Sequence, residues 1–119
     1  MGLALVEVPR FRAVLERRGE RFARRVFSPG ELAYTANKKL GWQNLAARFA
    51  AKVAGRAALR PALGRSLPLA GLEVTRLSSG APLLALTSHA GVDEAFSFQL
   101  SLTHDADFAL ASVWVEAAP

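Results

Sequence analysis

The sequence contains no cysteine, and this absence excludes several kinds of chemistry at once. Disulfides, thiolate metal ligands and cysteine nucleophiles all require a cysteine. The two histidines, His89 and His104, lack acidic neighbours at ligand spacing and do not predict a zinc site. No apolar run reaches the ~20 residues of a membrane-spanning helix, and the N-terminus lacks the features of a signal peptide. The sequence therefore predicts a cytoplasmic protein that does not enter a membrane.

Hydrophobic residues make up 51% of the chain, which is enough to bury a core. The 119 residues predict one domain over residues 1–119. Helical spacing dominates the first half and strand-like alternation dominates the second. This order predicts an α+β fold in which N-terminal helices pack on a mostly antiparallel sheet.

The first expected helices follow an N-terminal strand. Pro9 suits the first turn of a helix, and Gly19 is expected to interrupt that helix. Ser28 and Glu31 have the spacing of a capping box, in which each residue satisfies a free backbone amide of the other. The box predicts a short helix over residues 29–37.

A central helix is expected from Trp42 to Leu59, and Pro61 is expected to end it because proline supplies no amide hydrogen. Apolar or alternating stretches predict strands over residues 2–8, 72–77, 82–87, 96–103 and 108–115. The last stretch is apolar on both faces, which predicts either a central strand or one that a partner chain covers.

The net charge of +5 hides an asymmetry between the two halves. Residues 1–60 contain 13 basic and 4 acidic residues, whereas residues 61–119 contain 2 and 6. A basic half favours an anionic partner, which is a phosphate-rich cofactor, an acidic protein or nucleic acid. Aromatic residues seldom alternate with basic ones, and no segment resembles a nucleic-acid recognition module. Nucleic acid is therefore the least favoured of the three.

Three basic residues of the central helix are spaced four apart: Arg48, Lys52 and Arg56. They form one stripe, and like charges at this spacing cost an isolated helix roughly 0.2–0.5 kcal/mol per pair. We therefore expect the stripe to face water or an anion.

The same helix carries a family resemblance. Residues 46–52 read AARFAAK, which resembles the pattern R-F-A-A-K-E-A of bacterial holo-acyl-carrier-protein synthases. Further segments match that family in order and spacing: residues 2–8, 21–32, 71–74, 79–82 and 100–104. Each segment is a weak signal alone, but together they cover almost the whole chain.

The resemblance implies an activity, a fold and partners. Members of the family transfer 4'-phosphopantetheine from coenzyme A to a serine of apo-acyl carrier protein, in fatty-acid biosynthesis. Coenzyme A is then the substrate and acyl carrier protein the partner. The resemblance also implies the compact α+β fold of the family, assembled as a homotrimer.

Matched positions imply roles for individual residues. Those expected to bind coenzyme A are Arg48, Lys52, Gly80, Pro82 and His104, of which Lys52 and His104 are the expected catalytic residues. The arginines expected to dock the acidic carrier protein are Arg10, Arg17, Arg18 and Arg21. His104 is also in phase with the apolar face of its strand, so a buried, hydrogen-bonded histidine is an equal alternative. A solvated face is the less favoured alternative for the arginines.

The metal-binding positions of the family depart from its pattern. There, Mg²⁺ is held by an aspartate of the first strand and a glutamate of the central helix, and the matching residues are Ala4 and Val53. Mg²⁺ loses its hydration reluctantly and prefers hard oxygen ligands, so the family's Mg²⁺ is not expected to bind tightly here. Two family lysines are also replaced, by Ala57 and Ala81. Two alternatives follow: an active or impaired transferase, or a catalytically inactive homologue that still binds acyl carrier protein or coenzyme A.

Overall fold

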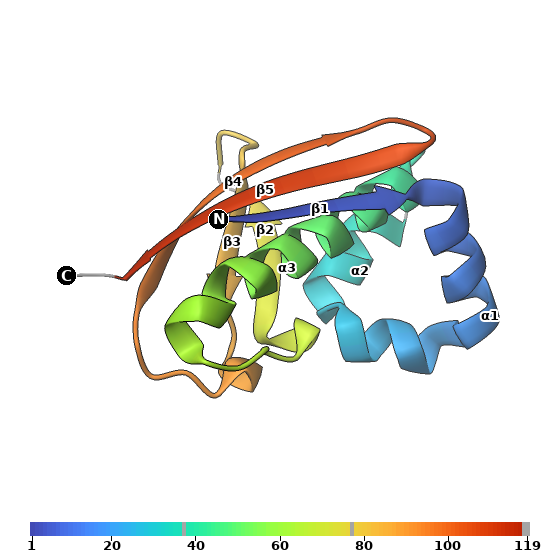
Figure 1. Cartoon of the computed structure of the whole chain (residues 1–119). Helices are drawn as coiled ribbons and strands as arrows, with labels where there is room; N and C mark the ends of the chain where they lie inside the picture. Colours follow the sequence, from blue (N-terminus) through green and yellow to red (C-terminus); the bar gives the residue numbers. More distant parts are fainter. Residues whose placement is uncertain (37, 77, 118–119) are drawn as a thin grey trace.

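The long helix α3 (Gly41–Leu63) lies along one face of a three-stranded antiparallel sheet (Figure 1). The computed structural model describes residues 1–36, 38–76 and 78–117. The strands of this sheet, in spatial order, are β1 (Gly2–Glu7), β5 (Phe108–Ala117) and β4 (Phe96–His104). The central position of β5 confirms the prediction made from its two apolar faces, and the architecture confirms the α+β fold class.

A second, two-stranded sheet packs on α3 and beside β4 of the first sheet. It pairs β2 (Leu72–Arg76) with β3 (Pro82–Leu86) in antiparallel register, so that Arg76 lies opposite Pro82. Single turns of 3₁₀ helix, Leu69–Gly71 and Ser88–Ala90, flank this hairpin. The end predicted for the first of these strands, at Leu77, lies outside the described residues.

Two helices connect β1 to α3. Helix α1 (Val8–Val26) bows away from α3 (Figure 1), and α2 (Pro29–Ala36) follows it after a short turn. Gly19 lies in the left-handed region at φ 81°, so α1 consists of two helical pieces joined at a kink. The helix expected to stop at Gly19 thus ends its first piece there, and a second piece follows directly. The end predicted for the second helix, at Asn37, lies outside the described residues.

The expectation that Pro61 ends the central helix is wrong. Helix α3 continues to Leu63 and ends at Gly64, which is left-handed and donates its amide to the carbonyl of Arg60. Pro61 lies in the last turn, where its missing amide removes one hydrogen bond while the rest of the turn still closes. The left-handed glycine, rather than the proline, ends the helix.

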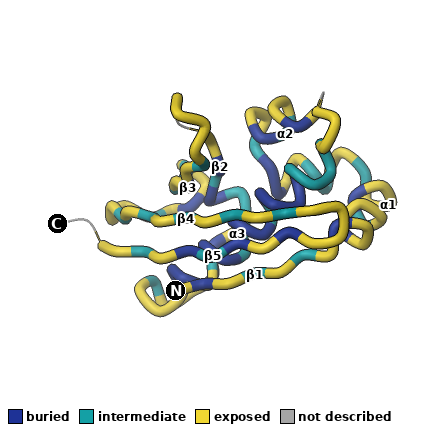
Figure 2. Tube along the Cα trace, turned by 90° about the horizontal axis from the view of Figure 1, so that it is seen from above, coloured by how far each residue is buried: buried dark blue, intermediate teal, exposed yellow. Residues whose placement is uncertain are grey.

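Small residues let α3 approach both sheets. A Cβ atom on Gly2 of β1 would lie 1.9 Å from the carbonyl oxygen of Ala54, and one on Gly55 would lie 2.8 Å from the side chain of Leu84 on β3. The alanines of α3 that face these contacts are almost completely buried: Ala46, Ala47, Ala50, Ala51, Ala54 and Ala58. Figure 2 shows the result, with α3 buried between the strands and most of α1 exposed.

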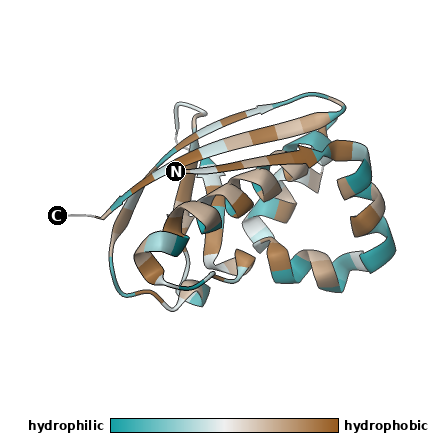
Figure 3. Ribbon diagram, in the orientation of Figure 1, coloured by the Kyte–Doolittle hydropathy of each residue, from teal (hydrophilic) through white to brown (hydrophobic). Residues whose placement is uncertain are grey.

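The outer face of the three-stranded sheet is exposed, and it is largely apolar along β1 and β5 but polar along β4. Large side chains on it are between 41% and 64% exposed: Leu3, Leu5, Phe108, Leu110 and Trp114. Figure 3 shows hydrophobic residues along β1 and β5, in contrast to the hydrophilic surface of α1. Among the described residues, no helix combines the length and apolar character needed to cross a membrane.

Candidate functional site

Helix α3 carries two buried cations one turn apart, Arg48 and Lys52, which are 2% and 0% exposed. Residues four apart share one helix face, so the two side chains leave α3 in similar directions. At neither position does the stripe face water, so the expectation that it faces water or an anion now depends on an anion. Charged groups are seldom buried without a partner, so the surroundings of each cation decide what it can do.

Lys52 has its anion within the chain. Its Nζ lies 2.6 Å from Oε1 of Glu31 and donates a 2.5 Å hydrogen bond to the carbonyl of Val26. Burial lowers the pKa of Lys52, while the charge of Glu31 and its hydrogen bond oppose that shift. The predicted coenzyme A ligand thus has no exposed surface in this structure.

Glu31 is also buried, and both of its oxygens accept backbone hydrogen bonds. The amide of Ser28 donates to Oε1, and the amide of Val74 on β2 donates to Oε2, each at 2.8 Å. The amide of Glu31 in turn donates to the Ser28 hydroxyl at 3.1 Å, which confirms the predicted capping box. The Ser28 hydroxyl donates to the carboxylate of Glu73. The sequence showed the box but not its links to Lys52 and β2.

Arg48 lies among other cations. Its guanidinium is 4.3 Å from the centre of the Tyr34 ring, and Lys38 and Arg76 approach the same ring at 4.6 and 5.2 Å. Its Nη1 donates a hydrogen bond of 3.3 Å to the carbonyl of Asn44. Its buried Nε has no hydrogen-bond partner within the described part of the chain. Burial and, next, the charge of Arg76 lower the pKa of Arg48.

Arg76 links this cluster to the β2–β3 hairpin. Its Nη1 donates a 2.6 Å hydrogen bond to the carbonyl of Gly80, and Pro82 is its partner in the strand register. The structure therefore brings the predicted residues Arg48, Gly80 and Pro82 to one region, whereas Lys52 faces the interior. We call the residues around the ring, Tyr34, Lys38, Arg48 and Arg76, the Tyr34 cluster.

Sequence reasoning missed three members of the Tyr34 cluster. Tyr34, Lys38 and Arg76 come from different elements and belong to no local motif. Two signals were available: Tyr34 is the only tyrosine of the chain, and Arg76 is one of two basic residues in the second half.

His104 ends β4 and contacts the first turn of α3. Its Nδ1 lies 2.9 Å from Oε1 of Gln43, and the residue is half-buried. An amide oxygen can only accept a hydrogen bond, so Nδ1 is the donor in this contact, and in the neutral ring Nε2 then carries the lone pair. The ring is thus held in the tautomer that can accept a proton at Nε2.

The predicted docking arginines lie on α1, and all four are exposed: Arg10, Arg17, Arg18 and Arg21. Beside them is an apolar cavity of about 320 Å³ between α1, β1 and α3. Phe11, Val14, Phe22 and Phe49 line it, and Arg10 lies at its edge. The arrangement offers an apolar hollow with positive charge beside it.

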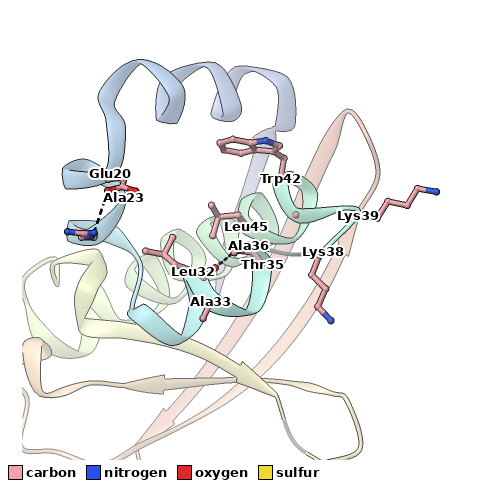
Figure 4. A pocket seen from close by; sticks show the side chains of 12 residues that line it. Glu20, Ala23, Leu32, Ala33, Thr35, Ala36, Lys38, Lys39, Trp42 and Leu45 are labelled. Carbon is pink, nitrogen blue, oxygen red and sulfur yellow. Dashed lines mark hydrogen bonds and ion pairs between the residues drawn. The ribbon is translucent and has the colours of Figure 1, made fainter.

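A larger cavity of about 600 Å³ lies between α1, α2 and the start of α3. Figure 4 shows that Trp42 and Leu45 line it, while the side chains of Lys38 and Lys39 extend away from it. Its other charged residues, Glu20 and Arg24, pair with each other at 3.4 Å. The cavity thus offers apolar contacts but no free charge directed inward.

The family's metal positions carry no ligand atoms. Ala4 packs against the core beside α3, and Val53 lies on α3. Residues 1–36, 38–76 and 78–117 contain no group of three or more His, Cys, Asp or Glu side chains that could hold a metal ion. Mg²⁺ requires hard oxygen ligands, so these residues do not fit the ion.

Three comparisons extend this description to known proteins. Residues 1–113 match the 4'-phosphopantetheinyl transferase superfamily. The holo-[acyl-carrier-protein] synthase of Solibacter usitatus (strain Ellin6076) is 36% identical over 122 residues, which cover 97% of this chain and 95% of that protein. The synthase of Caulobacter vibrioides (strain NA1000 / CB15N) is 39% identical over 127 residues, covering 100% and 96%.

Solved structures agree with the sequence relatives. The crystal structure of Helicobacter pylori holo-[acyl-carrier-protein] synthase in complex with coenzyme A has a TM-score of 0.80 and 28% identity. The similarity covers 97% of this chain and 98% of that one.

Proposed function

The chain belongs to the 4'-phosphopantetheinyl transferase superfamily, and from this membership we propose that it transfers 4'-phosphopantetheine from coenzyme A to a serine of apo-acyl carrier protein. Coenzyme A is the proposed substrate and acyl carrier protein the proposed partner. This is the activity that the resemblance implies from the sequence.

The main structural support for this proposal is the Tyr34 cluster. Lys38, Arg48 and Arg76 gather three positive charges around one ring. Coenzyme A brings several phosphate charges, and arginine binds phosphate well because its donors match the oxygen geometry. An anion at the cluster would relieve the repulsion between Arg48 and Arg76. Gly80 and Pro82, next to Arg76, are the proposed contacts of the rest of the nucleotide.

The transfer itself needs a base and positive charge. The serine hydroxyl oxygen attacks the phosphorus that bears pantetheine, a P–O bond to serine forms, and the P–O bond to 3',5'-ADP breaks. The hydroxyl proton must leave, and Nε2 of His104 has the lone pair to accept it because Gln43 holds the proton on Nδ1. Cations of the Tyr34 cluster offset charge on the phosphate oxygens.

The proposed carrier-protein surface is the exposed arginine row of α1 with its apolar cavity. An acidic partner would meet Arg10, Arg17, Arg18 and Arg21, and one apolar side chain of that partner would fill the 320 Å³ hollow. Opposite charges raise the rate of encounter, and the buried side chain supplies affinity.

We propose that the chain assembles as a homotrimer through the outer face of its three-stranded sheet. Leu5, Leu110 and Trp114 are large apolar side chains exposed there, and exposed apolar patches mark interaction sites. The number three comes from the family resemblance. Native mass spectrometry should show a trimer, and Trp114→Glu should yield monomer; a wild-type monomer at working concentration would refute the assembly.

A second candidate rests on Ala4 and Val53. Because neither can bind Mg²⁺, the protein could be a homologue that binds acyl carrier protein or coenzyme A without turnover. The two candidates share both partners and differ only in whether the serine is modified.

Intact mass of apo-acyl carrier protein separates them. The carrier protein is incubated with this protein and coenzyme A, with Mg²⁺, with Mn²⁺ and with EDTA. A gain of one phosphopantetheine establishes the transferase, and a gain that persists in EDTA shows that no divalent ion is needed. No gain with the wild type, but a gain with Ala4→Asp/Val53→Glu, establishes the inactive homologue. Absence of binding to both partners would refute both candidates.

A further inference from the structure

Lys52 is enclosed by groups of its own chain. Its Nζ contacts Oε1 of Glu31 at 2.6 Å and the carbonyl of Val26 at 2.5 Å, and it lies 5.2 Å from the ring centre of Phe27. An ammonium group has three donors, and two of them are used here. With 0% exposure, the side chain offers no surface to a ligand.

The contacts of the Lys52–Glu31 pair join four parts of the fold: the end of α1, the start of α2, strand β2 and α3. Val26 is the last residue of α1, Ser28 lies in the turn before α2, and Val74 is on β2. Glu31 accepts the amides of Ser28 and Val74 while it pairs with Lys52 on α3. One buried ion pair therefore fixes the end of α1, the start of α2 and strand β2 to the same point of α3.

The joined elements carry the two proposed binding surfaces. The second half of α1 carries Arg21, and α3 and β2 carry Arg48 and Arg76 of the Tyr34 cluster. The first half of α1, with Arg10, lies beyond the kink at Gly19. It is anchored by Phe11 and Leu15 in the apolar cluster that also holds Val26, and it makes no contact with the ion pair within the described residues. Loss of the ion pair would therefore free the second half of α1 more than the first.

We propose that Lys52 and Glu31 are a positioning pair, which sets the second half of the docking helix relative to the Tyr34 cluster, and that Lys52 is not a ligand of coenzyme A. This inference rests on the proposed function because it assigns docking to α1. It replaces the catalytic role that the family resemblance implies for Lys52.

Binding measurements separate a positioning role from a ligand role. Isothermal titration calorimetry gives the affinities of the wild type and Lys52→Met for coenzyme A and for apo-acyl carrier protein. Methionine keeps the length of the side chain and removes its charge. We expect carrier-protein affinity to fall at least tenfold and coenzyme A affinity to fall by a smaller factor, since Tyr34 and Arg76 are held only indirectly, through α2 and β2. The reverse result, lost coenzyme A affinity with intact carrier binding, would overturn the proposal.

Double variants locate the effect on α1. Arg21→Ala should weaken carrier binding in the wild type but not further in Lys52→Met, whereas Arg10→Ala should weaken it in both. Equal losses from Arg21→Ala in the two backgrounds would contradict the proposal. If Lys52→Met does not fold, Glu31→Gln/Lys52→Met removes both buried charges and supports the same comparison.

Hydrogen exchange tests the inference without relying on activity. In Lys52→Met, the amides of residues 20–27 should exchange at least tenfold faster, and those of residues 11–18 should change less than threefold. Equal acceleration in both halves of α1 would overturn the positioning role. A wild type that binds no carrier protein would refute the proposed function, while the exchange result would still decide whether Lys52 holds this half of the helix.

Discussion

Lys52 and Arg48 lie one turn apart on α3, and their surroundings differ in one respect. Lys52 has a carboxylate at 2.6 Å and a backbone carbonyl at 2.5 Å. Arg48 has an aromatic ring that it shares with Lys38 and Arg76. Both cations are buried, but only the first has a directly bonded anion within the described residues.

The difference separates structural cations from binding cations. A buried ion pair with its hydrogen bonds in place needs nothing further, and removal of one partner leaves an uncompensated charge. A cation whose neighbours are other cations is stabilised when an anion arrives. The Lys52 region therefore maintains the fold. The Arg48 region is available to phosphate through its two exposed cations, Lys38 and Arg76, since Arg48 itself is buried.

The largest expected effect is on the Lys52 side of this comparison. Glu31→Gln should lower the free energy of unfolding by roughly 3–5 kcal/mol because Lys52 would keep a buried charge without its carboxylate. Adding Lys52→Met to that variant should restore at least half of the loss. Urea unfolding measures both changes. Glu20→Gln, which removes an exposed carboxylate paired with Arg24, is the control and should cost less than about 1 kcal/mol.

The matching change on the other side is Arg48→Met. The substitution removes a buried positive charge that is repelled by Arg76. The free energy of unfolding should therefore change by less than about 1.5 kcal/mol. Coenzyme A affinity should fall at least tenfold in titration calorimetry, because a charge-assisted contact is lost. The distinction between a structural Lys52 and a ligand-binding Arg48 is refuted if Arg48→Met destabilises the fold as much as Glu31→Gln. It is also refuted if Arg48→Met leaves coenzyme A affinity unchanged.

A smaller effect is expected at the rim of the Tyr34 cluster. Arg76 is exposed, so Arg76→Ala should weaken coenzyme A binding about three- to tenfold. Arg65 is the other basic residue of the second half, and it instead donates to the carbonyls of Ala90 and Gly91. Arg65→Ala should leave the affinity unchanged. Equal losses in the two variants would show that general positive charge, rather than the cluster, attracts coenzyme A.

The smallest effect concerns a charge that is satisfied but fully exposed. The amides of Phe108 and Asp107 donate to Asp105 and lower its pKa below the ordinary 3.8. Because the folded pKa is the lower one, the stabilisation is present above about 3.8 and is lost as the pH falls through the folded value. In Asp105→Asn, the melting temperature should fall less between pH 5 and pH 2 than it does in the wild type. An unchanged pH profile would contradict it.

The sequence predicted the features that depend on neighbouring residues. The Ser28–Glu31 box, the kink at Gly19 and the two apolar faces of β5 follow from spacing and residue type, and the structure contains all three. The family resemblance supplied the fold and its predicted site residues. It could not show that Arg48 and Lys52 face different surroundings.

The remaining features depend on tertiary contacts. Glu31 and Lys52 are 21 positions apart, and the Tyr34 cluster joins residues of α2, α3 and β2 with Lys38 between the two helices. The spacing of residues within one helix or strand cannot predict contacts between such distant segments. The prediction that Pro61 ends the central helix was wrong for a related reason. The free-energy cost of a proline in a helix depends on how many helical hydrogen bonds follow it, and few follow Pro61.

Trp114, on the outer face of β5, gives the molecule an internal optical probe. The chain has two tryptophans, and Trp114 is 57% exposed. Indole emission moves to shorter wavelength when water leaves the ring, so burial of this sheet face would appear as a blue shift on concentration. In a Trp42→Phe variant the whole signal would come from Trp114, and assembly could be followed in dilute solution without any attached dye.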